Sequence, residues 1–472
     1  MKKYKSNFII ILIGIIVIFL IIFYILSFLR TFFSKNDVIC ENCNVILISI
    51  DNLRADHLGC YGYYKNTSPN IDELAKNGII FTNTITQATW TVSHLPILSS
   101  LYVSTSFPSY LNSSNISMLQ LQVPNYTVLL PQVLKEKNYV TAAFVNAPIL
   151  SSFYNYNKGF DFFDEEGALN RVQYGDIKNV NNRIINWLEN NSKNKFFLFI
   201  HYYDVHDPYN PDEKYFKLFD ENYTDYTFLN NKLGNCGICD VPLDKSNISE
   251  KEREIVTAAY DGKIRYTDEN IKKLIDKLKE LGIIKNSIII ITADHGNPLG
   301  DHGQFSHGYQ FYDESLHVPL IFILPENQRK IIKSQVRSID IMPTILDILG
   351  FQIPNYIDGE SLVPFIEGKE TNLVAFTESF SSISMRDNNI KFILNIKTGK
   401  EELYNLSNDP KEKFNIANNI STEKFKLEIS KFIENNKNKF ISLSKNNELI
   451  TEINETKKKE IEERLKELGY VT

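Results

Sequence analysis

The segment that decides the fold is Asn44-Val45-Ile46-Leu47-Ile48-Ser49-Ile50-Asp51, an uncharged run that ends at a carboxylate. Such a short apolar run predicts a strand buried on both faces of a parallel sheet. Three later runs have the same character, at 195–200, 287–291 and 319–324. Helical patterns lie between these runs, and the clearest is 68–78, which has Ser68 at the N-cap, Pro in the first turn and Gly past the end. The alternation predicts an α/β domain with a mainly parallel sheet sandwiched by helices.

The composition places limits on the class of protein. The chain has 472 residues, of which 43% are hydrophobic and 23% are charged, so neither wholesale disorder nor a multi-span membrane protein is indicated. The formal net charge of −6 argues against a general nucleic-acid binder, which would carry a basic surface. We therefore expect no nucleic-acid partner.

One segment near the start differs from this average composition. From Phe8 to Leu29 the chain has 22 uncharged residues, and a helix of that length would cross a hydrocarbon core of about 30 Å. No small-residue cleavage site follows it, which favours an uncleaved signal anchor. Three lysines precede the segment, against Arg30 and Lys35 after it, so the positive-inside rule predicts a single-pass cell-membrane protein with the rest of the chain outside.

The pattern along the chain divides it into four parts. Residues 1–36 are the expected cytoplasmic tip and transmembrane anchor, 37–371 the main α/β domain, 372–425 a small C-terminal α+β subdomain, and 426–472 a charged helical tail. The stretch 212–250 is polar and aperiodic, which predicts a long loop or an insertion near the site.

The cysteines include two close pairs, Cys40 with Cys43 and Cys236 with Cys239. In an oxidising compartment such pairs form disulfides, whereas close cysteines can also bind zinc. The two pairs lie too far apart in the sequence for a zinc ribbon, and a structural disulfide is the favoured interpretation.

Polar side chains capable of holding a metal follow three of the predicted strands. They are Asp51 after the first, His201, Asp204 and His206 after the second, and Asp294 and His295 after the third. In open α/β sheets ligands bind beyond the carboxyl ends of the strands, so these side chains are candidates for one site. A single Asp or His after a strand is more often a loop residue, but three such strand ends in one sheet indicate a function.

A carboxylate next to an imidazole, as in Asp294-His295, offers one oxygen and one nitrogen ligand. This pair suits zinc or manganese more than calcium or magnesium, so we expect one divalent metal ion, with zinc or manganese favoured. A nucleophile is also needed, and Thr91 stands where a helix can begin. An alcohol is a poor nucleophile at neutral pH unless a metal activates it. Alternatively, Thr91 only caps the helix.

With these residues in view, the chain resembles the sulfatase family of the alkaline-phosphatase superfamily along nearly its whole soluble length. The matching segments are Asn44 to Gly62, Ser68 to Asn83, Asp204 to Tyr209, Asp294 to Gly308, Tyr312 to Pro319, Ser338 to Asp347 and Leu403 to Pro410. The resemblance implies an alkaline-phosphatase-like fold, a metal held by Asp51, Asp294 and His295, and an anionic ester as substrate.

The chain departs from the family pattern at the nucleophile. Sulfatases that carry formylglycine have Cys-x-Pro-x-Arg, or Ser in place of Cys, where this chain has Thr91-Val92-Ser93-His94-Leu95. A threonine cannot become formylglycine, and in this respect the chain is similar to phosphoethanolamine and phosphoglycerol transferases, as it is at His307. Asn52 stands where many sulfatases have a second Asp, and 142–150 lacks the usual Lys-x-His.

The resemblance and the residues together give one mechanism. Thr91 completes the metal sphere and attacks phosphorus or sulfur in line, while His206 and His307 contact the non-bridging oxygens or the leaving group. The remaining site residues, expected to contact substrate or to support the ligands, are Asn52, Arg54, His201 and Asp204.

Phosphate or phosphodiester substrates are slightly preferred on this basis, and a lipid head group or a surface glycan would suit an outward-facing enzyme. A true sulfate-ester hydrolase is the first alternative. A catalytically inactive surface binding module is the second.

Overall fold

The computed structural model describes residues 19, 21–24, 38–107, 110–111, 120–169, 176–221, 249–305, 307–326, 328–380, 382–445, 459 and 463. The transmembrane segment expected at 8–29 lies almost wholly outside the described residues, as do Cys236, Cys239 and most of 212–250. Within the described parts of the chain, no helix combines the length and the apolar character that crossing a bilayer requires.

In the part of the chain that the structure describes, nine strands form the main sheet, in the order β4-β3-β5-β1-β6-β7-β2-β8, with β9 paired to β2. Their bounds are β1 Asn44–Ile50, β2 Ile79–Ile85, β3 Val140–Phe144, β4 Phe162–Asp164, β5 Phe196–Tyr202, β6 Ser287–Thr292, β7 His317–Ile323, β8 Lys330–Ile332 and β9 Val336–Arg337. The strand at the centre is β1, which pairs in parallel with both β5 and β6, so that Val45 lies opposite Phe197 and Ile288. The predicted α/β fold with a mainly parallel sheet is confirmed.

The prediction of a parallel strand at 319–324 is wrong in direction. Residues 319–323 of this segment belong to β7, which runs antiparallel to both of its neighbours, β6 and β2. A parallel connection needs a crossover of a dozen or more residues, usually a helix, that returns the chain to the opposite edge of the sheet. The described residues between β6 and β7 form only short helical turns, the longest being α11 (Asp313–Leu316). The chain therefore stays at the carboxyl edge, and the next strand runs back.

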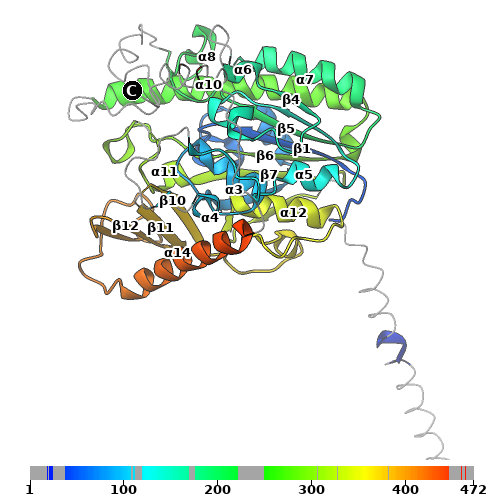
Figure 1. Ribbon diagram of the computed structural model, residues 1–472. Helices are drawn as coiled ribbons and strands as arrows, with labels where there is room; N and C mark the ends of the chain where they lie inside the picture. The colour runs from blue at the N-terminus through cyan, green and yellow to red at the C-terminus, as the bar shows by residue number, and fades with distance from the viewer. Residues whose placement is uncertain are drawn as a thin grey trace, which may run out of the picture.

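Helices cover both faces of the main sheet (Figure 1). Because side chains alternate along a strand, Val45 and Leu47 of β1 enter one apolar core while Ile46, Ile48 and Ile50 enter the other. The first core lies under α3, α5 and α12, and the second under α7 and α10. The helix bounds are α2 Pro69–Ala75, α3 His94–Ser99, α4 Val103–Ser106, α5 Leu130–Lys135, α6 Glu166–Leu169, α7 Ile177–Asn191, α8 Glu213–Phe216, α10 Glu250–Glu280, α12 Ile341–Ile348, α13 Val363–Ile366 and α14 Glu423–Ser444.

The start of α2 is capped differently from the prediction. Ser68 occupies the N-cap position, but its side chain makes no capping hydrogen bond and instead donates to Asp72 Oδ1 at 3.0 Å. The carboxylate of Asp268, on α10, accepts hydrogen bonds from the main-chain nitrogens of Asn70 and Ile71. Those nitrogens are therefore satisfied from a distant helix, which the local sequence could not indicate.

A second, antiparallel sheet follows, in the order β10-β11-β12-β13. Its bounds are β10 Ala375–Ser379, β11 Ser382–Asp387, β12 Ile390–Asn395 and β13 Glu401–Asn405, and Figure 1 shows α14 lying along it. The sheet is joined to the catalytic part through β10, because Thr377 Oγ1 donates to the carbonyl of Thr86 and Glu378 N donates to that of Gln87. It therefore contacts the segment that leads directly to Thr91.

A disulfide links Cys40 and Cys43 just before β1, as the favoured interpretation of this pair predicted. The main-chain nitrogen of Cys40 donates to Ile348 O at the end of α12. The link thus holds the entrance to the central strand against the helical layer.

Candidate active site

The carboxyl ends of the central strands bring the predicted metal ligands together. Asp51 directly follows β1, while Asp294 and His295 follow β6, the neighbouring strand. His295 Nε2 lies 3.6 Å from Asp51 Oδ1 and 3.3 Å from Asp294 Oδ2. All three side chains are fully buried. Two anionic oxygens and one imidazole nitrogen therefore face one another in the interior.

The donor atoms of this group fit a metal ion. Asp51 Oδ1, Asp294 Oδ2, His295 Nε2 and both side-chain atoms of Asn52 are buried and have no hydrogen-bond partner among the described residues. A buried polar atom without a hydrogen bond destabilises the folded state, so a group of such atoms indicates a bound ligand. The ligand atoms of Asp51, Asp294 and His295 all lie within 4.8 Å of one another. These three residues, with Asn52 beside them, can hold a divalent cation.

The hydrogen bonds of the ligands orient them toward the cation. His295 Nδ1 lies 2.9 Å from Gly296 O and donates to it, which leaves Nε2 for the metal. Burial alone would lower the pKa of His295, but the neighbouring carboxylates of Asp294 and Asp51 raise it to about 9. Burial would raise the pKa of Asp294, but His295 and His94 hold it well below its usual range. The site thus favours a positive charge among its carboxylates, and a cation can replace the Nε2 proton.

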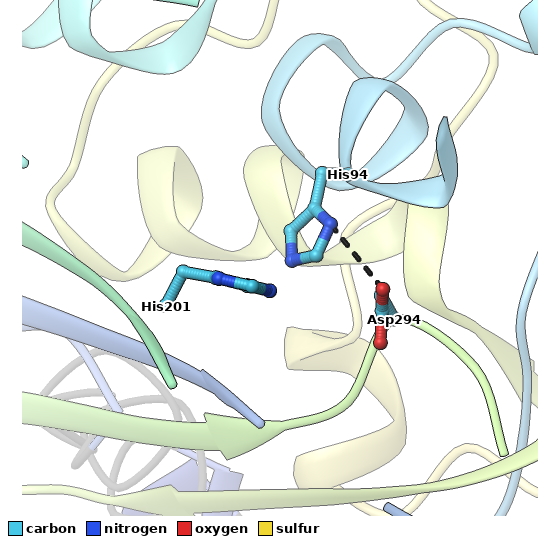
Figure 2. A group of neighbouring side chains, drawn as sticks. All are labelled: His94, His201 and Asp294. Atoms are coloured by element: carbon cyan, nitrogen blue, oxygen red, sulfur yellow. Dashed lines mark ion pairs between the residues drawn. The ribbon is translucent and has the colours of Figure 1, made fainter. Parts of the chain in front are cut away.

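A second group, His94, His201 and Asp294, shares Asp294 with the first, and Figure 2 shows its three side chains. His94 Nδ1 donates to Thr91 O at 2.9 Å and lies 3.5 Å from Asp294 Oδ2, and its Nε2 accepts from Ser49 Oγ at 2.9 Å. Burial lowers the pKa of His94 to about 4, so the ring is neutral, as these bonds require. Because both ring nitrogens are engaged, His94 is a positioning residue.

His201 supports the first metal ligand. Its Nε2 lies 3.2 Å from Asp51 Oδ2 and donates to it, so the other carboxylate oxygen is left for the cation. A ligand carboxylate held in this way keeps its orientation. The structure therefore brings His201, which the sequence suggested as a supporting residue, into contact with Asp51.

Thr91 is the first residue of the 3-10 helix Thr91–Ser93, which continues into α3. Its side chain is buried, and the hydroxyl oxygen has no hydrogen-bond partner in the described part of the chain. Ser93 Oγ donates to the carbonyl of Asp294 at 2.8 Å, and His94 reaches the carboxylate of the same residue. The Thr91 segment is therefore fastened to a metal-ligand candidate, while its hydroxyl is left for another partner.

His206 and His307 lie together on another side of the group. Their rings are 5.1 Å apart, and the ring of His307 stacks on that of His295 at 4.5 Å. His206 Nδ1 donates to Asp207 O at 2.7 Å, and His307 Nδ1 donates to Asn297 Oδ1 at 3.0 Å. Burial, together with the neighbouring His295 and His206, lowers the pKa of His307 well below its ordinary value.

Arg54 and Asp204 have other partners. Arg54 Nη1 donates to Asp301 Oδ2 at 2.7 Å and to Asn297 O at 3.3 Å, and its Nε donates to Asp56, so it ties two loops together. Asp204 Oδ1 accepts from Ile177 N at the start of α7, and burial raises the pKa of Asp204 to about 7. These contacts place both residues in the supporting structure around the site.

Two contributing residues, His94 and Asn297, were missed by the sequence interpretation. His94 stands in the quoted Thr91 segment, but nothing local shows that its ring meets Ser49 and Asp294. Asn297 orients His307, and its own amide donates to Tyr209. Its position three residues after Asp294, within a segment already singled out, is the only signal that could have drawn attention to it.

Buried carboxylates and an imidazole at the carboxyl edge of a mainly parallel sheet, beside a buried hydroxyl, define the class of metal-dependent ester hydrolases of the alkaline-phosphatase superfamily. The family model described as Sulfatase matches residues 43–351, and the model described as N-sulphoglucosamine sulphohydrolase, C-terminal, matches residues 300–439. The chain belongs to the sulfatase family.

Curated relatives agree with this assignment. An arylsulfatase of Clostridium perfringens is 29% identical over 266 residues, which is 53% of this chain and 54% of that protein. An ulvan-active sulfatase of Formosa agariphila is 25% identical over 460 residues, covering 84% of this chain and 80% of that protein. The match to the Clostridium protein thus spans about half of that relative's length.

Solved structures share the fold. A phosphonate monoester hydrolase of Agrobacterium radiobacter superposes with a TM-score of 0.68 at 20% identity, covering 84% of this chain and 96% of that one. A protein solved in complex with its substrate D-glucosamine-2-N,6-O-disulfate superposes with a TM-score of 0.66 at 20% identity, covering 86% of this chain and all of that one.

Proposed function

We propose that the chain hydrolyses sulfate esters by attack of the Thr91 hydroxyl beside a divalent cation held by Asp51, Asp294 and His295. The observation that carries this proposal is the buried Thr91 hydroxyl, unpartnered among the described residues, on a segment that Ser93 and His94 bind to Asp294. A hydroxyl that only capped a helix would accept a main-chain hydrogen bond, and within the described chain Thr91 accepts none.

The cation would neutralise charge on the ester and activate the hydroxyl. Of the candidate donors, Asp51, Asn52, Asp294 and Thr91 offer oxygen, and only His295 offers nitrogen. An oxygen-rich set suits calcium, magnesium or manganese more than zinc, and we propose an ion of that kind. This differs from the sequence expectation, which weighed only the Asp294-His295 pair.

The two remaining histidines serve the leaving group and the ester oxygens in this proposal. The Nδ1 atoms of His206 and His307 donate to fixed acceptors, so their Nε2 atoms are held in defined directions. An Nε2 atom in such a position can accept a proton from the attacking hydroxyl or, when protonated, donate one to the departing oxygen. His206 Nε2 is buried and has no partner among the residues described.

Phosphate or phosphodiester hydrolysis or transfer is the second candidate, and Thr91 itself favours it. Attack by Thr91 leaves a covalent ester on the threonine, which water or an acceptor alcohol must clear. A formylglycine hydrate could expel sulfate by breaking its own C–O bond, whereas threonine has no second hydroxyl for that step. The named relatives favour sulfate, and the nucleophile favours phosphate.

The test uses the purified full-length chain with Thr91→Val and Thr91→Ser. Valine keeps the shape of threonine and removes the hydroxyl, so turnover should fall by about three orders of magnitude or more, while serine should retain part of it. The assay compares aryl and sugar sulfates with phosphate monoesters and diesters. Mass spectrometry of the peptide containing Thr91 during turnover should show a sulfo or phosphoryl group. Full activity in Thr91→Val would end the proposal.

We further propose that the enzyme is held at the cell membrane by residues 8–29 and faces outward. The apolar stretch supports this topology, as does the Cys40–Cys43 disulfide, because disulfides persist in oxidising compartments. Substrates would then be surface glycans or lipid head groups. Protease added to intact cells should remove the catalytic domain; complete protection would contradict the topology.

A further inference from the structure

A cavity of about 270 Å³ lies where the segment after His307 meets the C-terminal sheet. Its walls combine the exposed ring of Tyr309 and apolar side chains such as Ile393 with amide, hydroxyl and charged groups, among them Gln310, Ser382, Asn395 and Lys400. The cavity has room for about one sugar ring, and its volume lies just below the usual range of about 300–1,000 Å³ for ligand sites.

The cavity is joined to the candidate active site through the carbonyl of Gly308. This oxygen accepts hydrogen bonds from Thr89 Oγ1, at 2.7 Å, and from Ser379 Oγ. Gly308 follows His307 directly, and Thr89 precedes Thr91 by two residues. Three segments therefore meet at the carbonyl oxygen of Gly308. They are the segment of Thr91, the end of β10, and the segment that runs from His307 into the cavity wall.

A row of aromatic rings runs from this junction toward the surface. Trp90, next to Thr91, is buried and stacks on Phe380 with centroids 5.9 Å apart and an interplanar angle of 14°. Tyr309 stacks on the same Phe380 at 5.7 Å and is 58% exposed. Phe380 has φ of +40°, a left-handed conformation that is rare for a bulky residue and that persists where the surroundings hold it. The row is thus a constrained feature of the fold.

One wall of the cavity carries a buried polar atom without a partner. Gln310 is only 9% exposed, and its side-chain oxygen has no hydrogen-bond partner in the described residues. An unpaired buried acceptor is destabilising unless a ligand donates to it. A hydroxyl-bearing ligand beside the ring of Tyr309 would supply that donor.

We propose that this cavity binds a sugar ring next to the one that carries the ester, with the ring's C–H face on Tyr309 and a hydroxyl on Gln310. This inference rests on the proposed function, since it names the substrate as a saccharide. The lining argues for a sugar over other ligands. Lys400 and His302 are the lining groups that can carry a positive charge, and they are already paired, with Glu402 at 2.8 Å and with Glu314 at 2.6 Å, which is a poor arrangement for a phosphate. The polar groups of the wall equally disfavour an acyl chain.

The experiment uses the full-length chain with Tyr309→Ala and Gln310→Leu, and Tyr64→Ala as the matched control. Tyr64 is 84% exposed, makes an edge contact with the ring of Tyr63, and is not among the residues that line the cavity. The substrates are sulfated disaccharides from chondroitin, heparin and carrageenan, and the corresponding sulfated monosaccharides. Loss of one stacked ring should lower kcat/KM for a disaccharide about ten-fold and leave the monosaccharide nearly unchanged.

Binding of the unsulfated disaccharides, followed by ligand-observed NMR, separates failure of this inference from failure of the proposed function. If no ester is turned over but Tyr309→Ala abolishes disaccharide binding, the sugar site stands and the proposed activity falls. If disaccharide binding and turnover are the same in Tyr309→Ala, Gln310→Leu and Tyr64→Ala, the sugar site is overturned. Tyr309-dependent binding to phosphatidylglycerol vesicles in place of saccharides would also overturn it.

Discussion

His295 Nε2 lies 3.6 Å from Asp51 Oδ1, across the neighbouring strands β6 and β1. Neither atom has a hydrogen-bond partner among the described residues, although both are buried. A cation between them would remove the repulsion between Asp51 and Asp294 and satisfy both atoms. The stability of this part of the fold should therefore depend on metal.

Removing one ligand charge should weaken the metal site. In Asp51→Asn the carboxylate becomes a neutral amide of the same shape, so we expect metal content below about half of the wild-type value and turnover lower by about two orders of magnitude or more. Elemental analysis and ester hydrolysis of the purified chain measure both effects. Asp276→Asn, on the exposed surface of α10, is the matched control and should change neither. Undiminished metal and activity in Asp51→Asn would rule out the proposed ligand.

Truncating His94 should reduce stability as well as activity. His94→Ala leaves Ser49 Oγ without the imidazole and removes the ring's bond to Thr91 O, which keeps only the main-chain N–H of residue 94. We expect the free energy of unfolding to fall by about 2–4 kcal/mol. His94→Gln can replace one of the two bonds and should recover part of that loss. Denaturant titration and kcat are the measurements. An unchanged kcat in a stably folded His94→Ala would show that His94 does not position Thr91.

Asn297→Ala should affect turnover more than binding. Without the amide oxygen that accepts from His307 Nδ1, the imidazole can rotate and change its tautomer. We expect kcat to fall by about 10–100-fold, with KM and metal content nearly unchanged. Asn186→Ala, on the outer face of α7, provides a control for the same substitution. Equal losses in kcat and in metal content would instead indicate that the segment around Asn297 had lost its structure.

Stability should fall as pH rises through neutrality because of Glu378. Burial raises the pKa of this carboxyl to about 7, and its Oε2 accepts from Ser104 N at 3.1 Å. Since the folded-state pKa is above the unfolded value, the folded chain binds the proton more tightly. The stabilisation is complete below the unfolded pKa and is lost as pH rises through about 7.

Glu378→Gln should remove this dependence. Relative to the variant, the wild-type chain should lose about 2–3 kcal/mol of unfolding free energy between about pH 5 and pH 8. Urea titrations of both proteins at several pH values give the difference. Parallel pH profiles would show that Glu378 is ionised in the folded state throughout this range.

The sequence indicated the sheet and the converging ligands because those features depend on local pattern. The apolar runs before Asp51 and Asp294 specify buried strands, and parallel strands bring their carboxyl ends to one edge. The direction of β7 could not be foreseen, since it depends on whether the segment before it crosses the sheet.

Contacts between distant segments were also beyond the sequence. The role of His94 depends on Ser49 and Asp294, and the capping of α2 depends on Asp268 of another helix. Asn297 matters only because Oδ1 of its amide meets His307. In each case the partner is specified by packing, for which a single sequence contains no periodic signal.

Asp294 has two kinds of contact at once. Its carboxylate faces the candidate cation, while its own carbonyl accepts hydrogen bonds from Thr86 and Ser93, which precede and follow Thr91 in the chain. The position of the Thr91 segment relative to the candidate cation is therefore set largely through one residue, whose carboxylate and carbonyl are joined by only a few covalent bonds. A replacement at position 294 would remove the carboxylate but keep the main-chain carbonyl, so the bonds that position the Thr91 segment should persist when the candidate cation ligand is lost.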